Sequence, residues 1–279
     1  MIYDVIIIGK GPAGISASLY TARANLKTLI IGKDDSDLAK AESIENYYGL
    51  EKPISGKELL ERGINQAKNL DIEFISDEVV GILYNEHFIV RTVGNEYKAK
   101  TLILATGAKR STSKIKGIEE NEGKGISYCA ICDGFFHKNK DVAVLGNGDY
   151  AISEALELAP VVNKVTILTN GLTANETRHP KIIFNDKKIR EFRGESSYVI
   201  EFEDNSSLDI SGLFVAEGTA ASTDFAKKLG IELDKNSIKV DENMKTNLPG
   251  IFACGDCTGG FMQISKALYE GATAGLSAI

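Results

Sequence analysis

The chain has 279 residues, a length that suits two domains better than one compact core. Its composition, 43% hydrophobic and 25% charged, is that of an ordinary globular protein, and no apolar run approaches the ~20 residues that span a bilayer. The net charge of −7 argues against nucleic acid as a main partner. The first residues enter a strand pattern without a leader, so we expect a cytoplasmic protein that is not bound to a membrane.

The first predicted elements are a strand, a glycine loop, a helix and a second strand. Residues 5–8 form an apolar run, Gly9-Lys10-Gly11-Pro12-Ala13-Gly14 follows, and residues 13–25 and 28–31 have helix and strand patterns. Glycines at this spacing let the backbone approach a pyrophosphate, and the helix N-terminus supplies N–H groups. This βαβ unit predicts a dinucleotide site; the alternative is a glycine turn that holds no ligand.

One group expected of such a unit is missing. An acidic residue usually ends the second strand and holds a ribose hydroxyl. Here Gly32 and Lys33 stand in that place, although Asp34 and Asp35 are close enough to substitute.

The middle of the first domain is predicted from periodicity alone. Residues 33–57 are polar and loop-like, and residues 56–70 have a helical pattern. Short alternating runs from 72 to 104 predict a small antiparallel sheet inserted into the fold. The chain then returns to the main sheet over residues 102–107.

The pair Cys129 and Cys132, followed directly by Asp133, is the first sign of redox chemistry. Two thiols at this spacing can close a small, strained disulfide ring that is readily reduced and re-formed. Exchange needs one thiol as a thiolate and an acid or base nearby, and Asp133 could serve that need. The basic, Ser/Thr-rich stretch before the pair, residues 109–116, is interpreted as an interdomain linker.

A second glycine loop repeats the opening unit. Residues 141–145 predict a buried strand, Gly146-Asn147-Gly148-Asp149-Tyr150-Ala151 follows, and a helix over 151–158 leads to a strand over 165–168. After that strand there is neither an acid for a 2′-hydroxyl nor an arginine for a 2′-phosphate. The second unit therefore has the pattern of a nicotinamide site without its recognition groups.

A basic run follows in this acidic chain. Its members are Arg178, His179, Lys181, Lys187, Lys188, Arg190 and Arg193. One interpretation is a docking patch for an acidic protein, and the other is a solvated surface hairpin. Strands are predicted next, over 198–202 and 212–216.

The last segment returns to the first domain. A strand over 250–253 ends in Cys254-Gly255-Asp256-Cys257, and a helix over 263–277 completes the chain. Cys254 and Cys257 are interpreted as small buried side chains or, alternatively, as a second redox pair. A zinc site shared by both cysteine pairs is a further alternative, although zinc ribbons are far more compact.

Together these patterns predict an α/β protein of two Rossmann-like dinucleotide-binding domains, the smaller inserted in the larger. Residues 1–112 and 245–279 are assigned to the first domain and residues 113–244 to the second.

In this order, the motifs resemble those of the low-molecular-weight bacterial thioredoxin reductases. The resemblance covers nearly the whole chain and includes both glycine loops. The other matching stretches are Glu45-Asn46-Tyr47-Tyr48-Gly49, Ala105-Thr106-Gly107, Cys129-Ala130-Ile131-Cys132-Asp133-Gly134, and Gly255-Asp256 followed by Gln263.

The resemblance implies a homodimeric FAD enzyme that reduces thioredoxin. Cys132 would face the flavin, Cys129 would attack the thioredoxin disulfide, and Asp133 would donate and accept the proton. The smaller domain would rotate between the two partners, and no metal is implied. The implied FAD contacts are Gly9, Gly11, Pro12, Ala13, Gly14, Asn46, Thr106, Gly107, Gly255, Asp256 and Gln263.

The chain departs from that family at the nucleotide site. Members that use NADPH carry H-R-R-x-x-x-R where this chain has Thr169-Asn170-Gly171-Leu172-Thr173-Ala174-Asn175, and Met262 stands where they tend to have Arg or His. The pattern is similar to the ferredoxin-dependent flavin thioredoxin reductases, which implies reduced ferredoxin as electron donor. The alternatives are an NAD(P)H-dependent reductase with a nonstandard nucleotide site and a flavin sensor without turnover.

Overall fold

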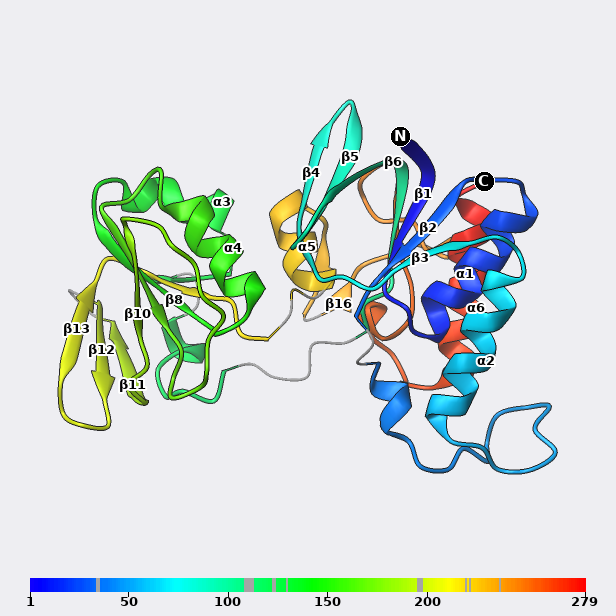
Figure 1. Cartoon of the computed structure of the whole chain (residues 1–279), viewed down its shortest axis with the longest axis horizontal. Coiled ribbons are helices and arrows are strands. Elements are labelled where there is room, and N and C mark those ends of the chain that lie inside the picture. The colour runs from blue at the N-terminus through cyan, green and yellow to red at the C-terminus, as the bar shows by residue number, and fades with distance from the viewer. Residues whose placement is uncertain are drawn as a thin grey trace. The chain divides into compact units, whose positions relative to one another are not determined.

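The computed structural model describes residues 1–33, 36–107, 113–121, 124–128, 130–194, 198–218, 220, 222–235 and 237–279. They divide into two compact units: unit 1 is Met1–Lys109 with Ala221–Ile279, and unit 2 is Arg110–Ala220. Each unit is an α/β structure built on a mostly or wholly parallel sheet (Figure 1).

A seven-stranded sheet of described residues forms the centre of unit 1, in the order β3-β2-β1-β6-β5-β4 with β17 beside β6. Neighbouring strands are parallel, except that β4 and β5 run antiparallel next to β6. The apolar residues of β1 from Tyr3 onward and those of β2 are buried because helices and other elements cover the sheet. The strands are β1 (Ile2–Ile8), β2 (Thr28–Ile31), β3 (Glu73–Ile75), β4 (Val79–Asn85), β5 (His87–Thr92), β6 (Glu96–Leu104) and β17 (Ile251–Ala253).

Helices α1 (Pro12–Arg23), α2 (Gly56–Lys68) and α6 (Ile264–Ser277) lie together beside this sheet (Figure 1). The axes of α1 and α6 approach closely, because a Cβ on Gly271 would lie only 2.2 Å from the carbonyl oxygen of Ala13. The shorter elements of unit 1 are η1 (Asp37–Lys40), α5 (Ser222–Leu229), β15 (Leu233–Asp234), β16 (Ser237–Ile238) and η4 (Asp256–Thr258). None of the helices in the described part of the chain has the length and apolar character needed to span a bilayer.

The small antiparallel sheet predicted over residues 72–104 is confirmed in part: β4, β5 and β6 pair in antiparallel fashion, but they do not form a sheet of their own. Strand β3 pairs in parallel with β2, and the β4–β5 hairpin pairs with β6, so all of them belong to the main sheet. β3 is an edge strand with an exposed Glu73. A half-covered edge strand alternates in sequence as an antiparallel strand does, which is why its pattern misled the prediction.

A parallel sheet in the order β10-β9-β8-β14-β7 organises unit 2. Helix α4 packs on β8 and β9, and α3 packs on α4. A second, antiparallel sheet, β11-β12-β13, contributes to the same core as β8 and β14. The elements are β7 (Ile126–Ser127), α3 (Ala130–Asp133), η3 (Gly134–His137), β8 (Asp141–Leu145), α4 (Asp149–Leu158), β9 (Lys164–Leu168), β10 (Ile182–Asn185), β11 (Ile189–Gly194), β12 (Tyr198–Phe202), β13 (Ser207–Ile210), β14 (Leu213–Val215) and, before them, η2 (Glu119–Asn121).

The basic run over residues 178–193 does not form a hairpin. Its first half is β10, which pairs in parallel with β9, and its second half is β11, which pairs with β12. In β11, Ile189 and Phe192 are buried in the core while Arg190 and Arg193 point outward. Arg190 and Arg193 therefore mark the outer face of β11, whereas the other basic residues lie outside the two strands: Arg178, His179 and Lys181 before β10, and Lys187 and Lys188 between β10 and β11.

The return to unit 1 comes at Ala221, earlier than the predicted boundary at residue 245. Ser222 bonds to Thr106, α5 packs on β4, and Met244 lies in the core that β1 and α1 share. These contacts place residues 222–244 with unit 1. The sequence of α5 does not show which unit the helix packs on, because a short amphipathic helix would have the same pattern in either unit.

Candidate functional site

The first glycine loop joins β1 to α1 and requires glycine at two positions. A Cβ on Gly9, where φ is +121°, would lie 2.2 Å from the carbonyl oxygen of Ala105. A Cβ on Gly14 would lie 2.1 Å from the carbonyl oxygen of Gly9. Both distances are far inside van der Waals contact, so the loop can lie against β6 only without these side chains.

Gly11 differs from its two neighbours, because a Cβ there would meet no atom within 4 Å. It is the N-cap of α1, with Pro12 at the first helical position, no side-chain cap and no acidic residue in the first turn. The N–H groups of this turn thus face open space with a partial positive charge, which fits a phosphate group.

Three strand ends meet at this loop. Gly9 lies against Ala105 after β6, and a Cβ on Gly255, after β17, would lie 2.9 Å from the Cβ of Ala13. Gly107, with φ +77°, also faces open space. The ends of parallel strands beside a helix N-terminus are where dinucleotides bind in such sheets, so the residues present fit FAD.

Two further predicted contacts come together from opposite ends of unit 1. The Nδ2 of Asn46 donates to the Oε1 of Gln263 at 3.2 Å, although the residues are 217 positions apart. Asp256 begins η4, directly after Gly255. The structure thus brings Asn46 to Gln263, and it places Asp256 next to Gly255, which contacts Ala13 of the first glycine loop.

Ser222 is a residue at this edge that the sequence did not point to. Its N–H donates to the Oγ1 of Thr106 at 2.7 Å, and the two hydroxyl oxygens lie 2.8 Å apart. The start of α5 therefore fixes the Thr106 side chain, and the connection, over 116 positions, has no local signal.

A buried ion pair, which the sequence analysis also missed, holds the turn that carries Asp256. Lys266 and Glu270 of α6 lie 3.0 Å apart, both nearly buried. Glu270 Oε2 accepts from the N–H of Gly255 at 2.8 Å and from the Thr258 hydroxyl at 2.8 Å. Lys266 Nζ donates to the carbonyl oxygen of Gly255 at 2.9 Å. We call these four residues the turn clamp; its sequence signal was the i,i+4 charge pair on an otherwise apolar helix face.

Cys254 and Cys257 flank the same turn as free, buried thiols. Burial raises the pKa of the Cys254 thiol well above its usual value, and the charges of Cys257 and Glu270 add to this. Burial likewise raises the pKa of Cys257 to about 12. Both groups are protonated at neutral pH, a state unsuited to thiol exchange, which favours the interpretation as small core side chains.

The place of the missing acid after β2 is filled by basic groups. Gly32 lies against the side chain of Lys10, whose Nζ donates to the Ser76 hydroxyl at 2.8 Å. Lys33 pairs with the buried Glu78 at 2.9 Å. Asp34 and Asp35, suggested as substitutes, lie outside the described residues.

The redox segment lies in unit 2. Cys129 is outside the described residues, and Cys132 belongs to α3, where only its backbone is described. Asp133 is half-buried at the end of the same helix. Beneath α3, the Oε2 of Glu154 in α4 accepts from the N–H of Ala130 at 2.9 Å, a bond that is fully buried.

The surface after the pair is apolar. Ile131, Phe135 and Phe136 are all more than half exposed. A pocket of about 560 Å³ opens beside them, lined by Phe136, His137, Lys140, Asp141, Tyr198, Asp209, Ile210 and Ser211.

The side chain of His137 is fixed in the wall of this pocket by two contacts. Its Nδ1 lies 2.8 Å from the Ser211 hydroxyl, and its ring meets Phe214 edge-on. Burial lowers the pKa of His137, Lys140 adds to this, and the Asp133 carboxylate opposes it.

The second glycine loop is tied to the segment that lacks arginines. The Nδ2 of Asn147 donates to the carbonyl oxygen of Thr173 at 2.8 Å, and the N–H of Asn175 donates to the carbonyl oxygen of Asn147 at 3.0 Å. The same segment is also bonded to β11, because Asn170 Oδ1 accepts from the N–H of Ile189 at 2.8 Å. These bonds tie the segment that follows β9 to the second glycine loop and to β11.

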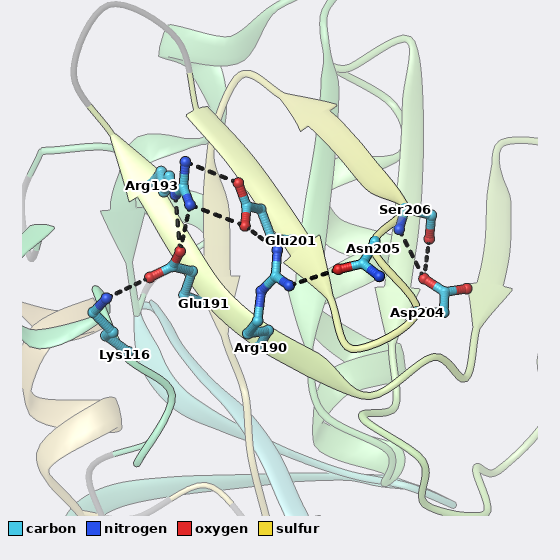
Figure 2. A network of polar contacts seen from close by, with 8 residues as sticks. All are labelled: Lys116, Arg190, Glu191, Arg193, Glu201, Asp204, Asn205 and Ser206. Atoms are coloured by element: carbon cyan, nitrogen blue, oxygen red, sulfur yellow. Dashed lines mark hydrogen bonds and ion pairs between the residues drawn. The ribbon is translucent and has the colours of Figure 1, made fainter.

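Most cations of the basic run have internal partners. Figure 2 shows that Glu191 joins Lys116 to Arg193, and that Glu201 joins Arg193 to Arg190. Hydrogen bonds from Lys116 and then Arg193 lower the pKa of Glu191 to about 2. Elsewhere in the run, Lys187 pairs with Asp204, and Lys181 donates to backbone carbonyls. Cations neutralised in this way make a weaker docking patch than their sequence suggests.

In the described part of the chain, no three side chains of His, Cys, Asp or Glu are grouped so as to hold a metal ion.

Comparisons with known proteins agree on one family. Residues 3–271 match the model described as pyridine nucleotide-disulphide oxidoreductase. The chain is 36% identical to the thioredoxin reductase of Listeria innocua over an alignment of 298 residues. The alignment covers 99% of this chain and 93% of the relative. Among solved structures, it is similar to the atypical thioredoxin reductase TRi from Desulfovibrio vulgaris Hildenborough, with 41% identity, a TM-score of 0.94 and coverage of 99% and 96%. A ferredoxin-flavin thioredoxin reductase from Clostridium acetobutylicum is 32% identical, with a TM-score of 0.74 and the same two coverages, 99% and 96%.

Proposed function

Because the chain belongs to the pyridine nucleotide-disulphide oxidoreductase family, as a thioredoxin reductase with FAD as its cofactor, we propose that it takes its electrons from reduced ferredoxin without a pyridine nucleotide. Bound FAD supplies the conversion of single electrons into a pair. These two electrons reduce a disulfide between Cys129 and Cys132 to a dithiol. The dithiol then reduces the disulfide of thioredoxin.

The observation that carries this proposal is the bridged second glycine loop. A pyridine nucleotide would place its pyrophosphate on the N-terminus of α4 and its ribose at the end of β9. Here the Nδ2 of Asn147 donates to the carbonyl oxygen of Thr173 and the N–H of Asn175 donates to the carbonyl oxygen of Asn147, so the segment after β9 is bonded to the loop that would receive the nucleotide. The bridging segment also offers no arginine for a 2′-phosphate. The similarity to a ferredoxin-flavin thioredoxin reductase from Clostridium acetobutylicum supports the proposal.

The chemistry at the pair needs a nucleophile, a second thiol and a proton carrier. The Cys129 thiolate attacks one sulfur of the thioredoxin disulfide, which breaks that S–S bond and releases the other sulfur as a thiolate. Cys132 then attacks Cys129, re-forms the ring and releases the second thioredoxin sulfur. Asp133 carries the proton between these groups. The exposed Ile131, Phe135 and Phe136 give a protein substrate an apolar surface next to the pair.

In unit 1, the proposed FAD contacts are the first glycine loop, Asn46, Thr106, Gly107, Gly255, Asp256 and Gln263. A homodimer, which the same resemblance implies, and a cytoplasmic location are also part of the proposal. Sedimentation of the holoenzyme at several concentrations tests the dimer directly.

Anaerobic bleaching of the flavin with different donors tests the electron source. We expect reduced ferredoxin to bleach the 450 nm band rapidly, while NADPH and NADH at equal reducing equivalents leave it unchanged. Rapid bleaching by NADPH, with ferredoxin inactive, would overturn the proposal. The Cys129→Ser variant is the control for the later step: its flavin should still bleach, and its thioredoxin reduction should be lost.

A second candidate is an NAD(P)H-dependent reductase with a nonstandard nucleotide site. It is favoured by the intact geometry of Gly146, where a Cβ would lie 2.2 Å from the carbonyl oxygen of Ala216, and of Gly148 as the N-cap of α4. The donor comparison separates it from the first candidate in a single series of traces.

A further inference from the structure

Glu154 is a buried carboxylate to which the proposed chemistry gives no role. It lies in the middle of α4 with 1% of its surface exposed. Burying a carboxylate costs several kcal/mol relative to water unless hydrogen bonds compensate. An apolar residue of similar size would fill the same space without that cost, so the charge at this position calls for a specific explanation.

The carboxylate is bonded to the backbone of the redox segment. Its Oε2 accepts from the N–H of Ala130 at 2.9 Å. This nitrogen is covalently joined to the carbonyl carbon of Cys129. The inner side of α3 rests on α4 at this point: Ala130 is 3% exposed, and a Cβ on Gly134 would lie 3.0 Å from Leu158. The opposite side, at Ile131, is exposed.

We propose that Glu154 is a positioning residue that fixes the Cys129–Ala130 peptide and sets the reduction potential of the Cys129/Cys132 pair. The inference rests on the proposed function only in taking these two cysteines as the redox pair. The hydrogen bond is fully buried, and the low dielectric of the interior strengthens its hold on this backbone group.

The direction of the effect follows from charge. Reduction adds two electrons and breaks the S–S bond, and each sulfur then either takes a proton or remains a thiolate. We take Glu154 as ionised in this proposal: a negative charge bonded to the peptide N–H that follows Cys129 disfavours a thiolate, whereas the disulfide carries no charge to be disfavoured. Glu154 therefore shifts the equilibrium toward the disulfide, which makes the dithiol a stronger reductant for thioredoxin.

The inference also explains why unit 2 keeps a glycine loop that its own chain bonds to. The loop sets the direction in which α4 leaves the sheet, with Gly148 as the N-cap. Glu154 lies further along this helix and reaches α3 from there. The loop thus has a use in supporting the redox segment that does not require a nucleotide.

The test compares the thiol–disulfide equilibrium of the pair in the wild type and in Glu154→Gln, Glu154→Asp and Glu203→Gln. Gln keeps an acceptor but removes the charge, and Asp keeps the charge. Glu203→Gln removes the same charge from an exposed site in the same unit. Each holoenzyme is equilibrated in dithiothreitol buffers and acid-quenched, and its two states are separated by reversed-phase chromatography.

We expect Glu154→Gln to change the equilibrium constant about tenfold toward the dithiol, about 30 mV less negative. Glu154→Asp should return to within about threefold of the wild type, and Glu203→Gln should match it. A Glu154→Gln constant within about twofold of the wild type overturns the proposal, as does a Glu154→Asp shift as large as that of Gln.

A measurement on the wild type covers the case in which Glu154→Gln does not fold. The Ala130 amide should exchange its hydrogen slowly in both redox states, because the buried carboxylate holds it. Exchange at the rate of an open chain overturns the proposal. Neither experiment uses ferredoxin, NADPH or thioredoxin, so a failure here is distinguishable from a failure of the proposed electron source.

Discussion

Gly14 and Gly11 of the first glycine loop differ in the room that the structure leaves for a side chain. Gly14 has no room for a methyl group, since a Cβ would lie 2.1 Å from backbone oxygen, while Gly11 has open space and ordinary backbone angles. The first position is constrained by the fold itself. The second is constrained only if a ligand fills the space, which makes the pair a test of where FAD lies.

We predict that Gly11→Ala leaves the stability of the apoprotein unchanged but weakens FAD binding at least about tenfold, or about 1.4 kcal/mol. Gly14→Ala should destabilise the apoprotein by about 3 kcal/mol, because the clash outweighs the helix propensity of alanine. Fluorescence titration of apoprotein with FAD and urea denaturation measure the two effects. Equal FAD affinity in Gly11→Ala and wild type would place the phosphates elsewhere.

The stability of unit 2 should depend on pH because of His137. Its pKa is lowered in the folded state by burial, while in the unfolded chain it is about 6.5. Below that pH the unfolded state binds a proton that the folded state does not, so stability is present above pH 6.5 and is lost as the pH falls. We predict that thermal unfolding scans from about pH 7.5 to about pH 5.5 show this loss in the wild type and a smaller loss in His137→Asn. Identical pH slopes would contradict the assignment.

Residues that bind through glycine or the backbone could be predicted from the sequence, because the backbone geometry that they permit is local. Those that act by reaching across the fold could not. Ser222 meets Thr106 only after 116 positions of intervening chain, and Glu154 meets Ala130 through the packing of two helices. A buried serine or glutamate in a helix reads in sequence as an ordinary polar position.

Among the elements, η4 and α6 depend on each other through the turn clamp. Lys266→Met removes the donor to the Gly255 carbonyl and leaves Glu270 as a buried charge without its cation. We predict a loss of about 3 kcal/mol in the free energy of unfolding. FAD binding should weaken as well, since the turn carries Asp256.

The matched control for the clamp is Lys239→Met, which breaks an exposed pair with Glu232 at 2.9 Å. Exposed pairs contribute about 0–1 kcal/mol, so this variant should stay close to the wild type. Calorimetry and FAD titration are the measurements. A loss equal to that of Lys266→Met would show that removing any lysine has the same effect.

Strands at the centre of a sheet were easier to predict than strands at its edge. β2 is buried throughout and β8 is buried from Val142 onward, and both were predicted with their observed bounds. β3 and β10 lie at the ends of their sheets and are partly exposed, so their sequences carry no sign of the strand that they pair with. Pairing at an edge depends on which neighbour is available, and that is a property of the assembled fold.

At the scale of the whole molecule, the two units have separate cores. One core includes Val5, Ile103 and Ala274, and the other includes Phe192, Phe202 and Leu213. We predict two calorimetric transitions. FAD at about 100 times its dissociation constant should stabilise the first unit by about 2.7 kcal/mol, a rise of roughly 5–10 °C in one transition only. A shift of both transitions together would mean that the units unfold as one.

The four cysteines of the molecule differ in a way that makes its redox state directly countable. Cys254 and Cys257 are buried and protonated, and only a thiolate reacts with an alkylating reagent. Native protein should therefore gain label only at the other pair, and only when that pair is reduced, whereas unfolding before labelling exposes the buried thiols as well. The two buried sulfurs thus serve as an internal standard, and the ratio of the two mass increments gives the electron content of the pair in an unmodified chain.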